Sequence, residues 1–106
     1  MAIAAYLAFE PADEEAARQV GAELERNGWT VARSNAELRT AERTPALIQT
    51  VGEAAVVVVV ASPAGQDSLW LQREVAAALN NGRPIIVVLA APISSDSWLS
   101  ATLDVA

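Results

Sequence analysis

Cysteine and histidine are both absent from this chain of 106 residues. Without cysteine there is no disulfide and no thiol nucleophile, and without histidine there is no imidazole base. The two commonest zinc ligands are therefore missing, and we expect no metal site. A serine hydrolase would need a base that the chain does not contain. Any chemistry must rely on carboxylates, hydroxyls, arginine and the backbone.

Positive charge is also scarce, because seven basic residues face thirteen acidic ones and the net charge is -6. No cluster of lysine or arginine relieves this balance, which argues against binding to nucleic acid or to an anionic membrane. The apolar runs are far shorter than the roughly 20 residues that a membrane span needs. The N-terminus lacks a basic segment followed by a cleavable apolar stretch. We therefore expect a cytoplasmic protein with no nucleic-acid or membrane partner.

Glycine-rich phosphate loops are missing as well. The first apolar run is followed by Phe9, Glu10 and Pro11 instead of a G-x-G-x-x-G turn, and the chain contains no P-loop. A phosphate-accepting domain built from alternating strands and helices would carry an aspartate at the end of its third strand. Here the third apolar run ends at Ala61 and Ser62. Cradling of phosphate by a glycine-rich turn is therefore not expected.

A fully apolar valine run from Ala55 to Ala61 is the most informative segment of the chain. A short β-branched run between turn residues is typical of a central strand in a parallel sheet that helices cover on both faces. With 53% hydrophobic and 19% charged residues the composition is globular. Its length fits one domain over residues 1–106.

Strands and helices are expected to alternate along the chain. The strands are expected at Ile3–Phe9, Trp29–Ala32, Ala55–Ala61 and Ile85–Leu89, and the helices at residues 11–27, Thr44–Gly52 and Ser68–Asn80, with Leu71, Val75, Ala78 and Leu79 as the core stripe of the third. The tail predicts either one helix from Asp96 or a frayed end. This alternation predicts a doubly wound parallel sheet in the order 2-1-3-4, with the switch point between strands one and three. No fifth strand is evident, so we expect an exposed sheet edge that favours association with another chain.

Ligands of such sheets bind beyond the carboxyl ends of the strands, which directs attention to the loop Ser62–Ser68 and the helix after it. Trp70 and Glu74 lie four residues apart on one face of this helix. Glu74 is a candidate catalyst, or a solvated surface charge with Trp70 covering the helix edge. Ser62 and Ser68 are candidate ligand contacts, or turn and helix-cap residues.

Several segments together resemble the TIR (Toll/interleukin-1 receptor) domain, especially its bacterial branch. They are I-A-A-Y-L-A-F-E-P-A-D-E-E-A-A, N-G-W-T-V, N-A-E-L-R-T-A-E-R, V-V-V-V-V-A-S-P, L-W-L-Q-R-E-V-A-A-A-L and G-R-P-I-I-V-V-L. The resemblance covers nearly the whole chain. It implies a flavodoxin-like fold, self-association through the loop after strand two, and, as in many members, cleavage of NAD+ by a glutamate on the third helix.

Glu74 is the position that matches this glutamate, and Trp70 matches the aromatic residue before it. Cleavage of the nicotinamide–ribose bond releases a neutral pyridine from a cationic ring, so no proton has to reach the leaving group. A lone carboxylate can hold the ribose hydroxyls and stabilise the oxocarbenium-like transition state. NAD+ would then be the substrate, and no cofactor is expected.

Phe9, Ser62, Ser68 and Trp70 are the candidate substrate-binding residues under this resemblance. Phe9 has two interpretations, because it can stack on a ring of NAD+ or belong to the core. Glu10 would repel a pyrophosphate.

The loop from Ser34 to Thr44 is the candidate interaction segment, with Glu37, Arg39 and Arg43 as interaction residues or ordinary solubilising charges. The resemblance implies a self-associated enzyme that hydrolyses NAD+ in bacterial defence or signalling. The alternative is a non-catalytic TIR interaction module that recruits partners through this loop and its helices.

Overall fold

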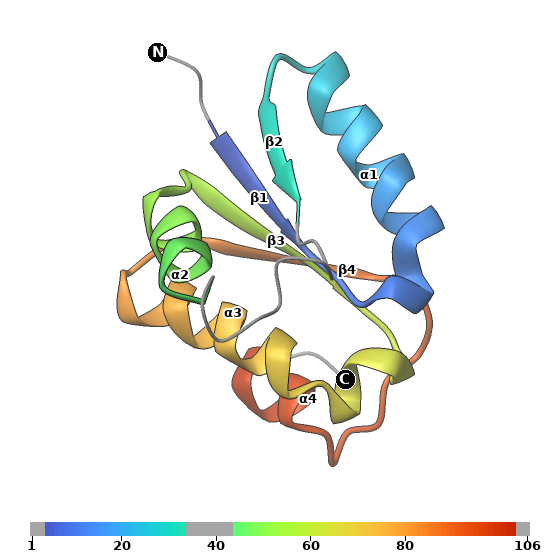
Figure 1. The fold of residues 1–106 in the computed structure, drawn as a ribbon. Helices are drawn as coiled ribbons and strands as arrows, with labels where there is room; N and C mark the ends of the chain where they lie inside the picture. The colour runs from blue at the N-terminus through green and yellow to red at the C-terminus, as the bar shows by residue number, and fades with distance from the viewer. Residues whose placement is uncertain (1–3, 34–43, 104–106) are drawn as a thin grey trace.

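The computed structural model describes residues 4–33 and 44–103 and has the α/β architecture that the sequence predicts (Figure 1). Its strands are β1 Ala4–Ala8, β2 Thr30–Arg33, β3 Val56–Ala61 and β4 Ile85–Leu89, its α-helices are α1 Glu14–Arg26, α2 Thr44–Glu53, α3 Leu69–Asn80 and α4 Trp98–Leu103, and short 3-10 turns η1 Pro11–Asp13 and η3 Pro63–Asp67 precede α1 and α3. All strand pairs are parallel. The strand order β2-β1-β3-β4 confirms the predicted topology.

Strand β3 lies inside the sheet between β1 and β4, and each of its residues is buried. Its neighbours fix the register, with Val57 opposite Tyr6 of β1 and opposite Ile85 of β4. β-Branched side chains suit an extended backbone, and burial on both faces removes the need for polar alternation. The valine run is therefore the central strand that the sequence predicts.

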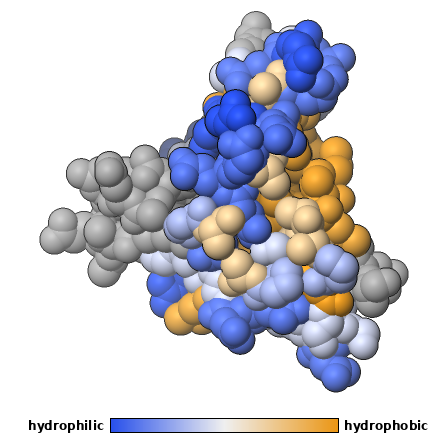
Figure 2. All heavy atoms as spheres, turned by 90° about the vertical axis from the view of Figure 1, so that its right-hand side faces the viewer, coloured by the Kyte–Doolittle hydropathy of each residue, from blue (hydrophilic) through white to orange (hydrophobic). Residues whose placement is uncertain are grey.

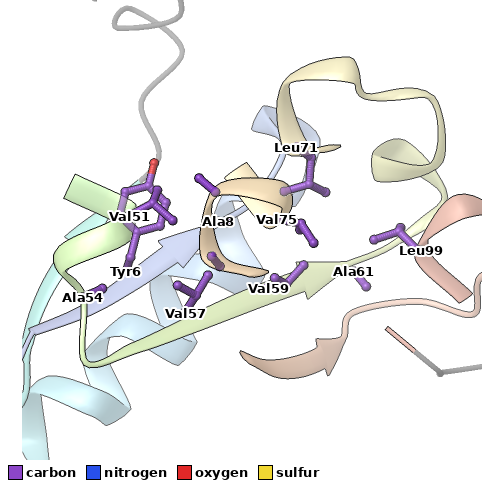
Figure 3. Packing of buried hydrophobic residues seen from close by; sticks show 12 residues of the cluster. Tyr6, Ala8, Val51, Ala54, Val57, Val59, Ala61, Leu71, Val75 and Leu99 are labelled. Atoms are coloured by element: carbon purple, nitrogen blue, oxygen red, sulfur yellow. The ribbon is translucent and has the colours of Figure 1, made fainter. Parts of the chain in front are cut away.

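Helices cover the two faces of the sheet unequally (Figure 1). On one face, Leu7, Val58 and Val60 form a small apolar cluster with Ala17 of α1. On the other face, the larger cluster joins β1 and β3 to α2, α3 and α4; it contains Tyr6, Ala8, Val51, Ala54, Val57, Val59, Ala61, Leu71, Val75, Ala77, Ala78 and Leu99 (Figure 3). The layer with three helices thus holds most of the core.

Local signals set the ends of α1 and α3. Glu14 and Glu15 lie in the first turn of α1, where their negative charge interacts favourably with the positive end of the helix dipole. Gly28 and Gly82 follow the two helices with φ angles of 90° and 65°, a backbone conformation that favours glycine. The predicted stops at both glycines are confirmed.

One apolar residue of α3 is more exposed than expected. Leu79 was expected in the core stripe of α3, but it is 51% exposed. Leu71, Val75 and Ala78 are buried. They turn one stripe of α3 toward the sheet, and Leu79, next to Ala78, turns to the outside because successive helical positions are about 100° apart. The prediction for Leu79 was therefore wrong.

The segment after β4 forms a short helix, so the frayed alternative is wrong. Helix α4 begins at Trp98, two residues after the expected Asp96. Ser100 donates a hydrogen bond from Oγ to the backbone oxygen of Ser94 at 2.7 Å. Leu99 is fully buried in the larger cluster and anchors this helix to the domain.

Strand β4 is an edge of the four-stranded sheet that the described residues form. Ile86 and Leu89 are about half exposed, at 53% and 52%. Figure 2 shows a side of the molecule on which hydrophobic residues gather beside a hydrophilic surface. The expectation of an open sheet edge is met within the described residues. Among their helices, none combines the length and apolar character needed to cross a bilayer.

Replacement of Val58 by Asp should unfold the domain, because Val58 is buried in β3 and an unpaired charge there costs several kcal/mol, about 4 or more. Ile86→Asp is the matched control, since Ile86 lies opposite Val58 in the register but is half exposed. It should lower the free energy of unfolding by about 1 kcal/mol or less. Thermal melts followed by circular dichroism measure both changes, and a normal melt for Val58→Asp would show that β3 is not central.

Candidate functional site

The loops after β1 and β3 meet at the carboxyl ends of these neighbouring strands. Ser62 donates a hydrogen bond from Oγ to Oδ2 of Asp13 at 2.5 Å. Ser68 donates in the same way to Oε1 of Glu10. Two serine–carboxylate pairs therefore join the two loops across the switch point of the sheet.

Both serines also cap the segments that follow them. The amide of Ala64 donates to Oγ of Ser62 at 3.2 Å, and the amide of Leu71 donates to Oγ of Ser68 at 2.9 Å. Each hydroxyl thus accepts one hydrogen bond from a backbone amide and donates its single proton in another, to a carboxylate. These contacts are those expected of turn and helix-cap residues. A role of the two serines in substrate binding stays a prediction.

Glu74 lies in the second turn of α3 and is 1% exposed. It follows Leu71 by one turn and precedes Val75, so it belongs to the stripe that faces the sheet. The hydroxyl of Tyr6 on β1 donates a hydrogen bond to Oε2 of Glu74. Glu74 is therefore not the solvated surface charge that one interpretation of the sequence proposed.

Tyr6 is the site residue that sequence reasoning missed. It is 1% exposed and lies opposite Ala32 of β2 and Val57 of β3. Figure 3 shows its ring rising from β1 beside Val51. A signal was present in the sequence, because a tyrosine inside an otherwise aliphatic strand brings a hydroxyl that needs a polar partner. Only the packing of α3 on β1 identifies that partner as Glu74.

Trp70 lies one turn before Glu74, at the edge of the same helix. Its ring is partly buried against the larger apolar cluster, and the guanidinium carbon of Arg73 lies 5.6 Å from the ring centroid. This distance is within the range of a cation–π contact. Trp70 thus contacts both the larger apolar cluster and a charged residue of α3.

Phe9 lies on the other side of the sheet from Glu74. It packs against the small cluster that includes Leu7 and Val58, beneath α1. With charged residues of α1 and β2 it lines a shallow depression of about 260 Å³; these residues are Glu14, Glu15, Arg18 and Arg33. The structure does not bring Phe9 together with Glu74, which favours the core interpretation of Phe9.

Ion pairs cross the surface of α1 around this depression. Arg18 donates to Glu15 from Nε at 3.0 Å and from Nη2 at 2.5 Å, and these hydrogen bonds lower the pKa of the Glu15 carboxyl. Arg33 reaches from β2 to Glu25 of α1 at 3.1 Å, and its guanidinium lies against Gly21. Such exposed pairs contribute little to stability, about 0.2–1 kcal/mol.

The predicted interaction residues Glu37, Arg39 and Arg43 lie outside the described residues. Within the described ranges, no three acidic, histidine or cysteine side chains come close enough together to hold a metal ion.

Comparisons with known proteins agree with this architecture. The family model of the TIR domain matches residues 6–104. Among solved structures, the chain is similar to a TIR-domain chain of the activated Roq1 resistosome directly recognizing the pathogen effector XopQ, with a TM-score of 0.65 and 19% sequence identity. The match covers 83% of this chain and 57% of that one, so this chain spans little more than half of its length. No curated protein sequence matches the chain. Because the family match extends over nearly every residue and the fold agrees with it, this chain belongs to the TIR domain family.

Proposed function

We propose that this TIR domain cleaves the nicotinamide–ribose bond of NAD+ in a self-associated state, with Glu74 as its catalytic residue. The burial of Glu74 carries the proposal. Within the described part of the chain it is the only buried acidic side chain. Burial of a carboxylate is costly, so a protein keeps one where a partner or a function requires it.

The chemistry of the site suits this reaction. The leaving nicotinamide departs as a neutral molecule, so the missing histidine and cysteine are not required. Positive charge develops on the ribose ring in the transition state, and a carboxylate that is shielded from water stabilises this charge more strongly than a solvated one. Glu74 would hold the ribose hydroxyls and supply this negative charge, with Trp70 beside the substrate at the edge of α3.

Access of substrate to Glu74 requires a change from the described state. At 1% exposure the carboxylate is closed off from solvent, so NAD+ must bind a state in which α3 and β1 open toward the substrate. A second copy that binds the open state more tightly than the closed one would shift the population toward it. Self-association is therefore part of the proposed mechanism.

Several features support self-association. The similar TIR domains of the Roq1 resistosome belong to an assembly. The edge strand β4 carries exposed apolar side chains, and the predicted interaction loop contains Arg39 and Arg43 on an otherwise acidic chain. A bacterial defence or signalling role and a cytoplasmic location complete the proposal, with NAD+ as substrate, no cofactor, and neither nucleic acid nor membrane as partner.

A non-catalytic TIR interaction module is the second candidate function. One observation favours it: Glu74 is enclosed and hydrogen-bonded to Tyr6, as a purely structural buried pair would be. Such a module would recruit other TIR domains through the loop after β2 and its helices. Release of nicotinamide from NAD+ by concentrated protein distinguishes the two candidates.

Glu74→Gln should abolish NAD+ cleavage and leave the fold intact, because glutamine keeps the shape and an acceptor for Tyr6 but removes the negative charge. Nicotinamide release, followed by chromatography, measures turnover. Glu23→Gln is the matched control, since Glu23 is an exposed residue of α1 paired with Arg26. It should retain the parent activity. Equal turnover by Glu74→Gln and the parent would rule out the catalytic role.

Specific activity should rise with protein concentration, because a neighbouring copy would complete the active state.

Arg39→Glu should weaken assembly without unfolding the protein, since reversal of a charge in the interaction loop opposes head-to-tail contact. Arg26→Glu serves as the charge-reversal control on α1 and should assemble like the parent. Light scattering and activity measured over a wide concentration range test this together. A flat specific activity, or normal assembly of Arg39→Glu, would contradict the role of self-association.

A further inference from the structure

Tyr6 occupies the middle of β1 and is the only tyrosine of the chain. Its side chain faces the layer of α2, α3 and α4 and is 1% exposed. The neighbours across the sheet are Ala32 and Val57, both smaller, so the ring lies among aliphatic side chains. A phenylalanine would fill the same space, and what it would lose is the hydroxyl.

The hydroxyl of Tyr6 donates to Oε2 of Glu74, a residue 68 positions away in the sequence. This hydrogen bond links the inner strand β1 to the helix that carries the proposed catalytic carboxylate. Figure 3 shows the hydroxyl oxygen of Tyr6 directed away from the strand. The donor is therefore held on a strand that is paired on both sides, and the acceptor belongs to a side chain of α3.

A glutamate side chain has three rotatable bonds, and its orientation decides where its negative charge lies. A hydrogen bond to one carboxylate oxygen restricts the directions in which the group can point. Catalysis by a charged group depends on such orientation, and a misplacement of about 1 Å can cost about a hundredfold in rate. We propose that Tyr6 is a positioning residue that orients the Glu74 carboxylate toward the ribose of NAD+, where it holds the hydroxyls and stabilises the developing positive charge. This inference rests on the NAD+ cleavage proposed above.

A structural role alone would also explain the pair, because any buried carboxylate needs donors. The two roles differ in what the loss of the hydroxyl changes. A structural role affects stability and leaves the chemical step of the folded enzyme unchanged. A positioning role lowers kcat while the protein remains folded and KM changes little.

The contact itself can be tested without NAD+, because one tyrosine gives one signal. Protein labelled with 3-fluorotyrosine should show a single ¹⁹F resonance from position 6. This resonance should move in Glu74→Gln, where the facing charge is lost, and stay in place in the control Glu23→Gln. A resonance that stays in place in both variants would overturn the inference, because the hydroxyl would then not face the carboxylate.

Kinetics test the positioning role. At a temperature where every variant is folded, Tyr6→Phe should lower kcat about tenfold or more and change KM by less than about twofold. Val58→Ala is the control for lost stability, since Val58 is buried on the opposite face of the sheet, and it should keep the parent kcat. Glu74→Asp gives a second variant, because it keeps the charge but withdraws the carboxylate from Tyr6, and it should lower kcat as well.

The outcomes separate this inference from the function on which it rests. If concentrated parent protein releases no nicotinamide, the proposed function fails and the inference fails with it. If the parent is active but Tyr6→Phe retains the kcat of Val58→Ala, only the inference is overturned. If Tyr6→Phe does not fold, a parent-like kcat for Glu74→Asp overturns it in the same way.

Discussion

Burial of β3 on both faces is the constraint on which the rest of this structure depends. Each fully buried valine side chain contributes about 1.5–3 kcal/mol through the hydrophobic effect, but only if other elements cover both sides of the strand. Helix α1 covers one side, and α2, α3 and α4 cover the other. The strands run parallel in the order β2-β1-β3-β4, with α1 on one face of the sheet and α2 and α3 on the other. This order places the ends of β1 and β3 side by side.

That adjacency creates the polar features of the domain. The loops after β1 and β3 are close enough for Ser62 and Ser68 to reach Asp13 and Glu10, so two hydroxyls join two acidic residues of the neighbouring loop. On the helix that follows, the stripe packed against β1 includes Glu74 among aliphatic residues. Tyr6 satisfies part of the hydrogen-bonding need of this carboxylate. The site is therefore part of the core, and burial of its carboxyl group carries a cost in desolvation.

The buried position of Glu74 favours electrostatic stabilisation in the proposed reaction but hinders access of the substrate. A carboxylate out of water interacts strongly with a developing positive charge, yet in the described state the substrate has no access to it. A TIR domain that is closed alone and opens on assembly would resolve this conflict. The exposed apolar residues of β4 are consistent with a domain that works with a neighbour.

Local patterns in the sequence were sufficient for much of the fold. The valine run, the glycine stops and the alternation of apolar segments predicted four parallel strands and their order, because backbone preferences and hydrophobic spacing act over a few residues. The strand predicted at residues 29–32 was observed at Thr30–Arg33, since the ends of a strand depend on pairing with β1. The position of Glu74 and Trp70 after the third strand, with the resemblance to TIR domains, also indicated these two residues as candidates.

Tertiary structure alone decided what surrounds these residues. No local pattern shows that Glu74 is enclosed or that its partner is Tyr6, because the two lie 68 positions apart and meet only when α3 packs on β1. Phe9 and Glu74 lie on opposite faces of the sheet, because Phe9 is directed to the face that α1 covers. Packing also decides why Leu79 is exposed while Ala78 is buried. Helical spacing defines a stripe, but only the packed sheet fixes the limits of that stripe.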